Sequence, residues 1–279
     1  MKKKILLIII ITALILSTSC KKKPSKKPMK IEQKEKASKT LVAIKDGVDD
    51  ILKKSEEIQK ILPLTEEELK IEKPETKGEG STTGDKKGGD KDKNKEKEKK
   101  PLTKSEILAK EWKDIDKKTE EIHKQWNSYE GEAMKKGATG EKVNDFKKSL
   151  NSFTLAVENR KISDIMDTGS KTYLSMAAFF DLYKDDTNGD LSRIKYAIYQ
   201  AYISAEKGNI EGAKTILDST EEYIIRIRQK LGKDKTKIKS LEKLSLGISD
   251  MKQSLNENSI KLLAIKRDIA LKNLKALEK

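Results

Sequence analysis

Cysteine and histidine side chains often act as nucleophiles, general bases or metal ligands. This sequence has one of each, Cys20 and His123. His123 lies beside Ile122, just off the apolar stripe of a predicted helix, where a solvated or boundary residue is expected. No second histidine is present to share a metal with it. No carboxylate stands in an apolar context that would raise its pKa for acid or base work. The Gly-rich phosphate loop, G-x-S-x-G and H-E-x-x-H motifs are absent, so we expect no enzyme, no metal site and no cofactor.

One acidic stretch has the odd-position spacing of a calcium loop, with Asp186, Asn188 and Asp190 as candidate ligands. Leu191 replaces the glycine that such a loop needs, and Ala197 replaces the acid at its twelfth position. A turn followed by a helix that Asp190 caps explains the same residues without a metal. We therefore favour the turn.

Cys20 lies at the end of a segment with the organisation of an export signal. Three lysines at positions 2–4 precede an apolar run from Ile5 to Leu16, and the small residues 17–19 lead into the cysteine. An apolar run of this length is too short to span a bilayer comfortably, which favours a signal over a transmembrane helix. An ordinary secretory signal with a chance cysteine is the alternative.

The segment resembles the signal and lipobox of bacterial lipoproteins, in the relaxed form of Borrelia-type spirochaetes. The usual box has Leu three residues before the cysteine, whereas here Leu16 is four before it and Ser17 holds that place. The resemblance implies that residues 1–19 are removed and that Cys20 receives fatty acyl chains such as palmitate. It also implies an envelope protein anchored in a membrane, for which we favour the outer membrane surface over the periplasmic leaflet.

Residues 20–30 predict a basic tether with two prolines, which does not form a helix. Residues 21–36 contain eight lysines and two glutamates. Such a segment would be attracted to an anionic leaflet. A solvated spacer is the alternative interpretation.

Residues 31–72 are predicted to form an N-terminal amphipathic helix, which runs from about Ile31 to Leu62. Its apolar residues follow alternating spacings of three and four, with Ser55 in the polar gap: Leu41, Ile44, Val48, Ile51, Ile58 and Leu62. A stripe this narrow indicates a partner helix for Leu41 to Leu62. Pro63 ends the helix, and Thr65 with Glu68 predicts a capping box for a short second one.

Residues 73–101 change character, because they are rich in glycine and alternating charge and contain no large apolar residue from Pro74 to Lys100. Such a stretch cannot bury enough surface to offset its ordering entropy, so we expect a disordered linker. On this interpretation the helix before it is separate. The body that follows should then fold without the first hundred residues and stand off from the anchor.

Residues 102–279 predict an all-α bundle of about six helices. The strongest begins at a Thr103–Glu106 capping box and carries Trp112, Trp126 and Tyr129 on one face. All thirteen aromatic residues lie between Trp112 and Tyr223, where the thickest part of the core is expected. Residues 197–217 resemble the turn of a tetratricopeptide repeat, but no second copy follows, so a generic helical hairpin is preferred.

The formal net charge is +15, of which the signal contributes three lysines. An exported chain meets little nucleic acid, so we expect no such partner. Eight cations gather around one predicted helix junction at Gly232 and form a candidate polyanion-binding site: Arg226, Arg228, Lys230, Lys233, Lys235, Lys237, Lys239 and Lys243. A patch of this kind would bind a sulfated polysaccharide or an anionic lipid surface. The alternative is that these cations only form the solvated faces of their helices and bind no partner.

Two functions fit these features. The first is a surface lipoprotein that binds a host protein or polysaccharide, as several Borrelia-type surface lipoproteins of similar general build do. The second is a periplasmic envelope scaffold in which the helix up to Leu62 pairs with a partner. No ligand-binding motif in the sequence decides between them.

Overall fold

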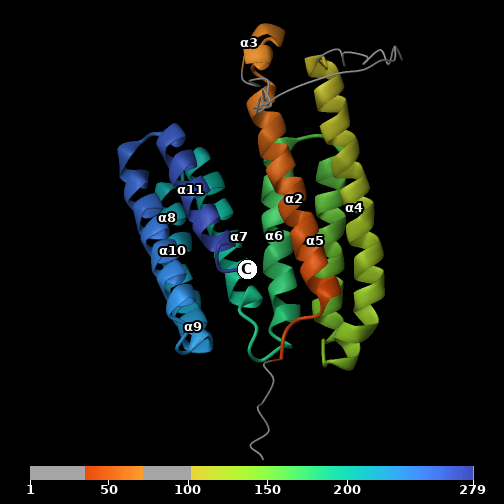
Figure 1. Ribbon diagram of the computed structural model, residues 1–279, viewed down its shortest axis with the longest axis vertical. Coiled ribbons are helices and arrows are strands. Elements are labelled where there is room, and N and C mark those ends of the chain that lie inside the picture. Colours follow the sequence, from red (N-terminus) through yellow and green to blue (C-terminus); the bar gives the residue numbers. More distant parts are fainter. Residues whose placement is uncertain (1–34, 72–101, 279) are drawn as a thin grey trace, which may run out of the picture. The chain divides into compact units, whose positions relative to one another are not determined.

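The computed structural model describes residues 35–71 and 102–278 (Figure 1). The predicted signal, Cys20, the basic tether and the linker at 73–101 lie outside these described residues. Residues 35–279 form one compact unit, which begins at Glu35. Every regular element within the described ranges is helical, which confirms the all-α class.

The chain order of the elements is simple. The α-helices are α2 (Lys39–Ile61), α3 (Glu66–Ile71), α4 (Lys104–Lys135), α5 (Gly140–Glu158), α6 (Ile162–Phe180), α7 (Asn188–Glu206), α8 (Ile210–Asp218), α9 (Thr220–Leu231), α10 (Lys235–Ser254) and α11 (Ile260–Lys275), with a 3-10 turn at Leu255–Glu257. Residues 102–278 thus contain eight α-helices where about six were expected. The difference arises because the hairpin at 207–209 and a break at Ser219 divide the stretch 188–231 into three helices.

Helix ends follow the local chemistry that the sequence indicated. The Thr103 hydroxyl accepts the Glu106 N–H while the Glu106 carboxylate accepts the Thr103 N–H at 2.8 Å, which completes the predicted capping box. Thr65 and Glu68 make the same reciprocal pair ahead of α3. Gly232 ends α9 with a φ of +60°, a conformation that side chains other than glycine rarely adopt.

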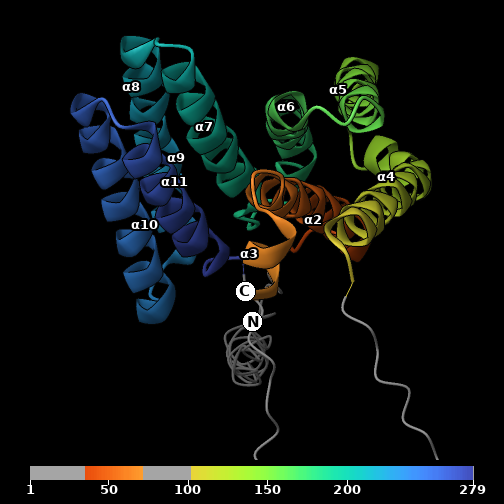
Figure 2. The same ribbon diagram turned by 90° about the horizontal axis from the view of Figure 1, so that it is seen from above.

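The helices form two groups that share one hydrophobic core (Figure 2). In the first group α2 packs on α4 and α6, and α5 packs on α6. In the second group α7 packs on α8, α9 and α11, and α10 packs on α11. The packing of α6 against α7 joins the two groups. Part of the first group's core is an aromatic cluster in which the rings of Trp126 and Phe146 lie 4.3 Å apart.

The expectation of a separate N-terminal helix is wrong. The apolar face of α2 is fully buried in the shared core: Leu41, Ile44, Val48, Ile51, Leu52 and Ile58. Its partners are α4 and α6 of the same chain, and only Leu62, just beyond its end, is half exposed. Gly47 permits the close approach, because a Cβ there would lie 2.7 Å from Cγ1 of Ile122 in α4. The narrow stripe is therefore one seam of an intramolecular bundle.

This packing changes the role of the segment between α3 and α4. Glu35 already belongs to the body, so residues 73–101 do not separate the body from the anchor as the sequence interpretation supposed. The two ends of that segment are held together, since the Lys104 ammonium donates to the carbonyls of Leu62 at 2.6 Å and Leu64 at 2.7 Å. The Lys104 N–H also donates to the Glu66 carboxylate at 3.0 Å. No helix of residues 35–71 or 102–278 is long and apolar enough to cross a membrane.

Candidate functional site

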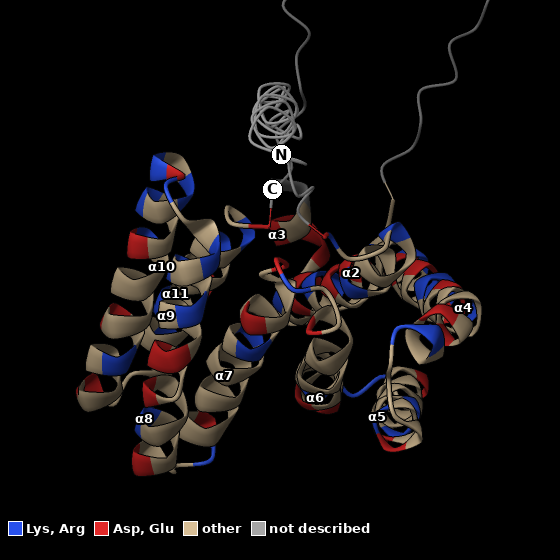
Figure 3. Cartoon of the chain, turned by 90° about the horizontal axis from the view of Figure 1, so that it is seen from below, with Lys and Arg blue, Asp and Glu red and all other residues tan. Residues whose placement is uncertain are grey.

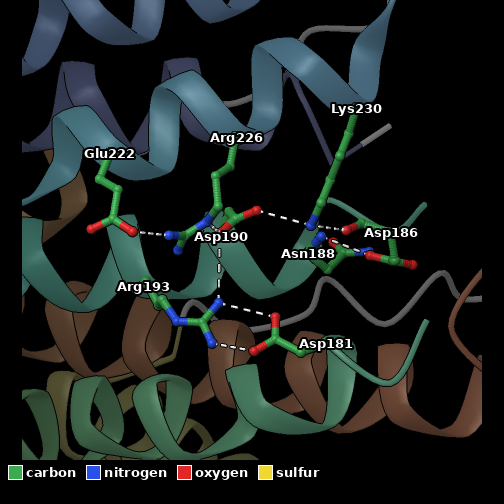
Figure 4. Close-up of polar contacts among 8 residues, drawn as sticks. All are labelled: Asp181, Asp186, Asn188, Asp190, Arg193, Glu222, Arg226 and Lys230. Atoms are coloured by element: carbon green, nitrogen blue, oxygen red, sulfur yellow. Dashed lines mark hydrogen bonds and ion pairs between the residues drawn. The ribbon is translucent and has the colours of Figure 1, made fainter. Parts of the chain in front are cut away.

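The predicted basic site divides in two in the structure. Arg226 and Lys230, on one face of α9, point at Asp190 in the first turn of α7 (Figure 4). Arg226 Nε lies 2.8 Å from Asp190 Oδ1, and Lys230 Nζ lies 3.0 Å from Asp190 Oδ2. The Asp190 side chain is only 1% exposed, and Arg193 adds a third cation at 3.6 Å. We call these four residues the Asp190 cluster. Two of the eight predicted polyanion-binding cations, Arg226 and Lys230, are therefore already paired with a carboxylate of the same chain.

The same geometry corrects the predicted role of Asp190. The residue that precedes α7 is Thr187, so Asp190 is not the N-cap but a buried counter-ion within the first turn. A carboxylate is favoured there because the helix N-terminus carries partial positive charge. The Asp186 carboxylate accepts the N–H of Asn188 at 2.7 Å and that of Ala37 at 2.9 Å. Among the described residues no group of His, Cys, Asp or Glu side chains has the arrangement of a metal site.

The other predicted cations lie at the corner between α9 and α10. Arg228 is 3.7 Å from Glu242, and both side chains are about half exposed. The remaining five lysines make no ion pair within the described ranges, and all but the half-buried Lys237 are exposed: Lys233, Lys235, Lys237, Lys239 and Lys243. We call these five the basic corner. In Figure 3 the lysines gather at the end of α10 next to α9, whereas blue and red alternate along α4.

A second ionic cluster, which sequence reasoning missed, joins the two helix groups. The Lys195 ammonium of α7 donates to both carboxylate oxygens of Asp49 in α2, at 2.7 Å and 3.0 Å. The Tyr173 hydroxyl of α6 also donates to Asp49. Glu278, near the end of the chain, accepts from both Lys45 and Lys195 at 2.9 Å. We call Lys45, Asp49, Tyr173, Lys195 and Glu278 the Asp49 cluster.

Burial and charge oppose each other in this cluster. Burial by itself would raise the pKa of Asp49, but the Lys195 and Lys45 ammonium groups hold that pKa below its usual value. Burial would likewise lower the pKa of Lys45, and the Glu278 and Asp49 carboxylates raise it above its usual value instead. Both groups are therefore charged at neutral pH, and each buried charge has an opposite partner.

A cleft of about 410 Å³ opens beside the Asp49 cluster. Four carboxylates, four lysines, two tyrosines and one leucine line it: Asp49, Asp50, Glu56, Asp268, Lys53, Lys195, Lys272, Lys275, Tyr173, Tyr199 and Leu271. The expectation that no carboxylate has surroundings that raise its pKa is wrong for Glu56, because burial raises the pKa of this residue. Its Oε1 lies 3.4 Å from the Arg267 guanidinium and has no hydrogen-bond partner in the described structure. The lining has equal numbers of carboxylates and lysines, so its charge favours neither an anionic nor a cationic ligand.

His123 is half-buried between α4 and α5, where its Nε2 lies 2.8 Å from the Thr154 hydroxyl. The structure thus places it at the boundary position that the sequence indicated. No carboxylate or second histidine is hydrogen-bonded to it within the described ranges.

No protein-family model, curated protein or solved structure matches this chain.

The sequence contained only a weak signal for the Asp49 cluster. Lys45 and Asp49 flank apolar positions of the stripe in α2 and are four residues apart, a spacing that is also usual for solvated ion pairs on a helix. Lys195 lies beside Ile194 in a similar context. Their burial depends on contacts between α2, α7 and Glu278 that are distant in the sequence, which the local pattern does not show.

Proposed function

We propose that this protein is a lipid-anchored envelope protein whose helical body binds a macromolecular partner and catalyses no reaction. The observation that carries the proposal is the short interval between the lipobox-like sequence at Cys20 and the start of the folded body at Glu35. Fifteen residues, fully extended, span at most about 50 Å. An acylated Cys20 would therefore keep the body within that distance of the membrane.

The side chains of the body support a binding role rather than a chemical one. Asp49 and Asp190, whose side chains are only 14% and 1% exposed, are each held by several cations. Carboxylates held in this way are poor proton carriers at neutral pH. His123 is bonded to a threonine rather than to an acid that would orient it for catalysis.

Acylation is tested by expressing the full-length chain in a bacterium with radiolabelled palmitate. We expect the label in the mature protein, extraction of that protein with detergent, and loss of both properties in a Cys20→Ala variant. Mass spectrometry of the mature N-terminus should show cleavage before Cys20 and added acyl chains. An unmodified and freely soluble mature protein would contradict the proposal.

We favour display on the outer surface with a host protein or polysaccharide as the partner. Proteolysis of intact cells should then remove the body, while a periplasmic control protein stays intact. A body that is digested only after the outer membrane is permeabilised would instead support a periplasmic scaffold.

A further inference from the structure

One end of the body carries both the start of the folded chain and the basic corner. Asp186 connects them, because its carboxylate accepts the N–H of Ala37 at 2.9 Å and its carbonyl accepts the Lys230 ammonium at 2.9 Å. Lys230 lies in the last turn of α9, two residues before Gly232 at the corner. Figure 1 shows the start of α2, the turn between α6 and α7, and the lower end of α9 at the same end.

The charge of this corner is not neutralised by its own neighbourhood. Between residues 231 and 243 there are five lysines and only two acidic residues, Asp234 and Glu242. Asp234 is used as the N-cap of α10, where it accepts the Lys237 N–H at 3.0 Å, and Glu242 faces Arg228. The Asp234 carboxylate lies at the positive end of the α10 helix dipole and offsets it, so it does not neutralise the lysine side chains. The corner therefore has a surplus of positive charge directed at solvent.

The position of the corner identifies which polyanion it meets first. If Cys20 is acylated, the membrane lies within about 50 Å of Glu35, and the end of the body that contains Glu35 is the end tied to it. A soluble polysaccharide has no such constraint and would meet the corner only by diffusion. Anionic lipid headgroups are thus the polyanion that the anchor would keep within reach of these five lysines.

We propose that the basic corner is a membrane-contacting surface, which binds anionic headgroups of the leaflet that carries the anchor and orients the body with the junction of α9 and α10 against the bilayer. This inference rests on the proposed acylation of Cys20 for its orientation, but the lipid affinity of the corner is a property of the body itself. Each lysine close to an anionic leaflet raises partitioning about fivefold.

The test uses the mature chain from Lys21 to Lys279, without Cys20, so that acyl chains contribute nothing. Its partitioning is measured by cosedimentation with vesicles of phosphatidylglycerol and phosphatidylcholine, and with vesicles of phosphatidylcholine alone. The corner variant is K233Q/K235Q/K237Q/K239Q. The control variant, K110Q/K113Q/K117Q/K261Q, removes the same charge from exposed lysines of α4 and α11 that make no ion pair within the described ranges. Circular dichroism verifies that all three chains are folded.

We expect the wild-type chain to bind the anionic vesicles only, and the corner variant to lose at least tenfold in partitioning while the control loses less than threefold. Equal losses would show a dependence on net charge alone and would overturn the proposal. Heparin retention that depends on the corner, with no corner-dependent vesicle binding, would also overturn it in favour of a polysaccharide.

The outcome is independent of the palmitate experiment. If the vesicle binding depends on the corner but the chain is never acylated in cells, the proposed anchor is contradicted and the lipid-binding surface is supported. If the chain is acylated but the corner and control variants lose equal vesicle partitioning, the anchor is supported and the lipid-binding surface is contradicted.

Discussion

Asp190, which is buried, and Asp49, whose side chain is 14% exposed, are two carboxylates that hold cations in different surroundings. The cations of Asp49 are themselves buried, because the side chains of Lys45 and Lys195 are only 3% and 7% exposed. The cations of Asp190 reach water, because the side chains of Arg226 and Lys230 are 35% and 25% exposed. An ion pair whose cation can be rehydrated costs less to break than one whose cation stays enclosed. The Asp49 cluster should therefore contribute more to stability than the Asp190 cluster.

The two clusters also differ in what they join. The Asp49 cluster brings together α2, α6, α7 and the chain end, and so connects the two helix groups. The Asp190 cluster joins α7 to α9, two helices of the second group. Loss of α2 should abolish the first cluster and leave every member of the second in the chain.

The largest expected effect is that of deleting α2. A chain that begins at Leu102 would expose the surfaces against which six fully buried Leu, Ile and Val side chains of α2 pack. Each such side chain contributes about 1.5–3 kcal/mol, and together they match the roughly 5–15 kcal/mol of a typical domain. We expect no cooperative thermal transition by circular dichroism. A cooperative transition like that of the full chain would show that residues 102–279 fold without α2, as the sequence alone predicts.

Replacing Asp49 by Ala should have the next largest effect. Lys45 and Lys195 would each lose a carboxylate partner while remaining buried, which costs about 3–5 kcal/mol. Urea denaturation measures the loss. The matched control is Asp50→Ala, because Asp50 is half exposed and 3.7 Å from Lys118, and this variant should lose no more than about 1 kcal/mol. Equal losses in the two variants would contradict the role given to the Asp49 cluster.

Replacing Asp190 by Ala should cost less, about 1–3 kcal/mol by the same measurement. Its side chain is buried, but Arg226 and Lys230 can turn toward solvent when it is removed. A loss larger than that of Asp49→Ala would reverse the comparison between the two clusters.

The smallest effect concerns pH. Because the pKa of Asp49 is lower in the folded chain, its stabilisation is present above the unfolded pKa of about 3.9 and is lost as pH falls through the lower folded pKa. The melting temperatures of the wild-type chain and an Asp49→Asn variant should therefore converge below about pH 4. A gap that stays constant down to strongly acidic pH would show that the charge of Asp49 is not its source.

Sequence alone predicted the local structure well, because local structure depends on neighbours in the chain. Apolar spacing located α2 and α4, and the pair of Thr103 and Glu106 fixed the start of α4. The apolar stripe of α2 did not reveal which helices cover it, because one apolar helix face can pack against any other apolar helix face. Gly47 was the available clue to a close neighbour, but a glycine within a helix has several explanations.

The polar residues of the site were harder to predict for a related reason. Asp190 follows a turn, and the sequence alone cannot separate a cap from a counter-ion when the cations, on α9, are 36 and 40 residues away. Lys45 and Lys195 are surrounded in the sequence by other charges and resemble solvated residues. Five of the eight predicted basic residues lie between positions 233 and 243, at the end of α10 that follows Gly232.

The contacts of Lys104 with Leu62 and Leu64 make the segment between α3 and α4 a permissive insertion site. Its two ends are held in place by contacts between the described residues on either side, and the entropy of closing a loop rises by only about 0.6 kcal/mol when its length doubles. Epitope tags, protease sites or whole peptides should be accepted there without loss of the fold. A single cut in the segment should leave two pieces that remain associated, so a lineage could vary this stretch freely while α2 stays in the core.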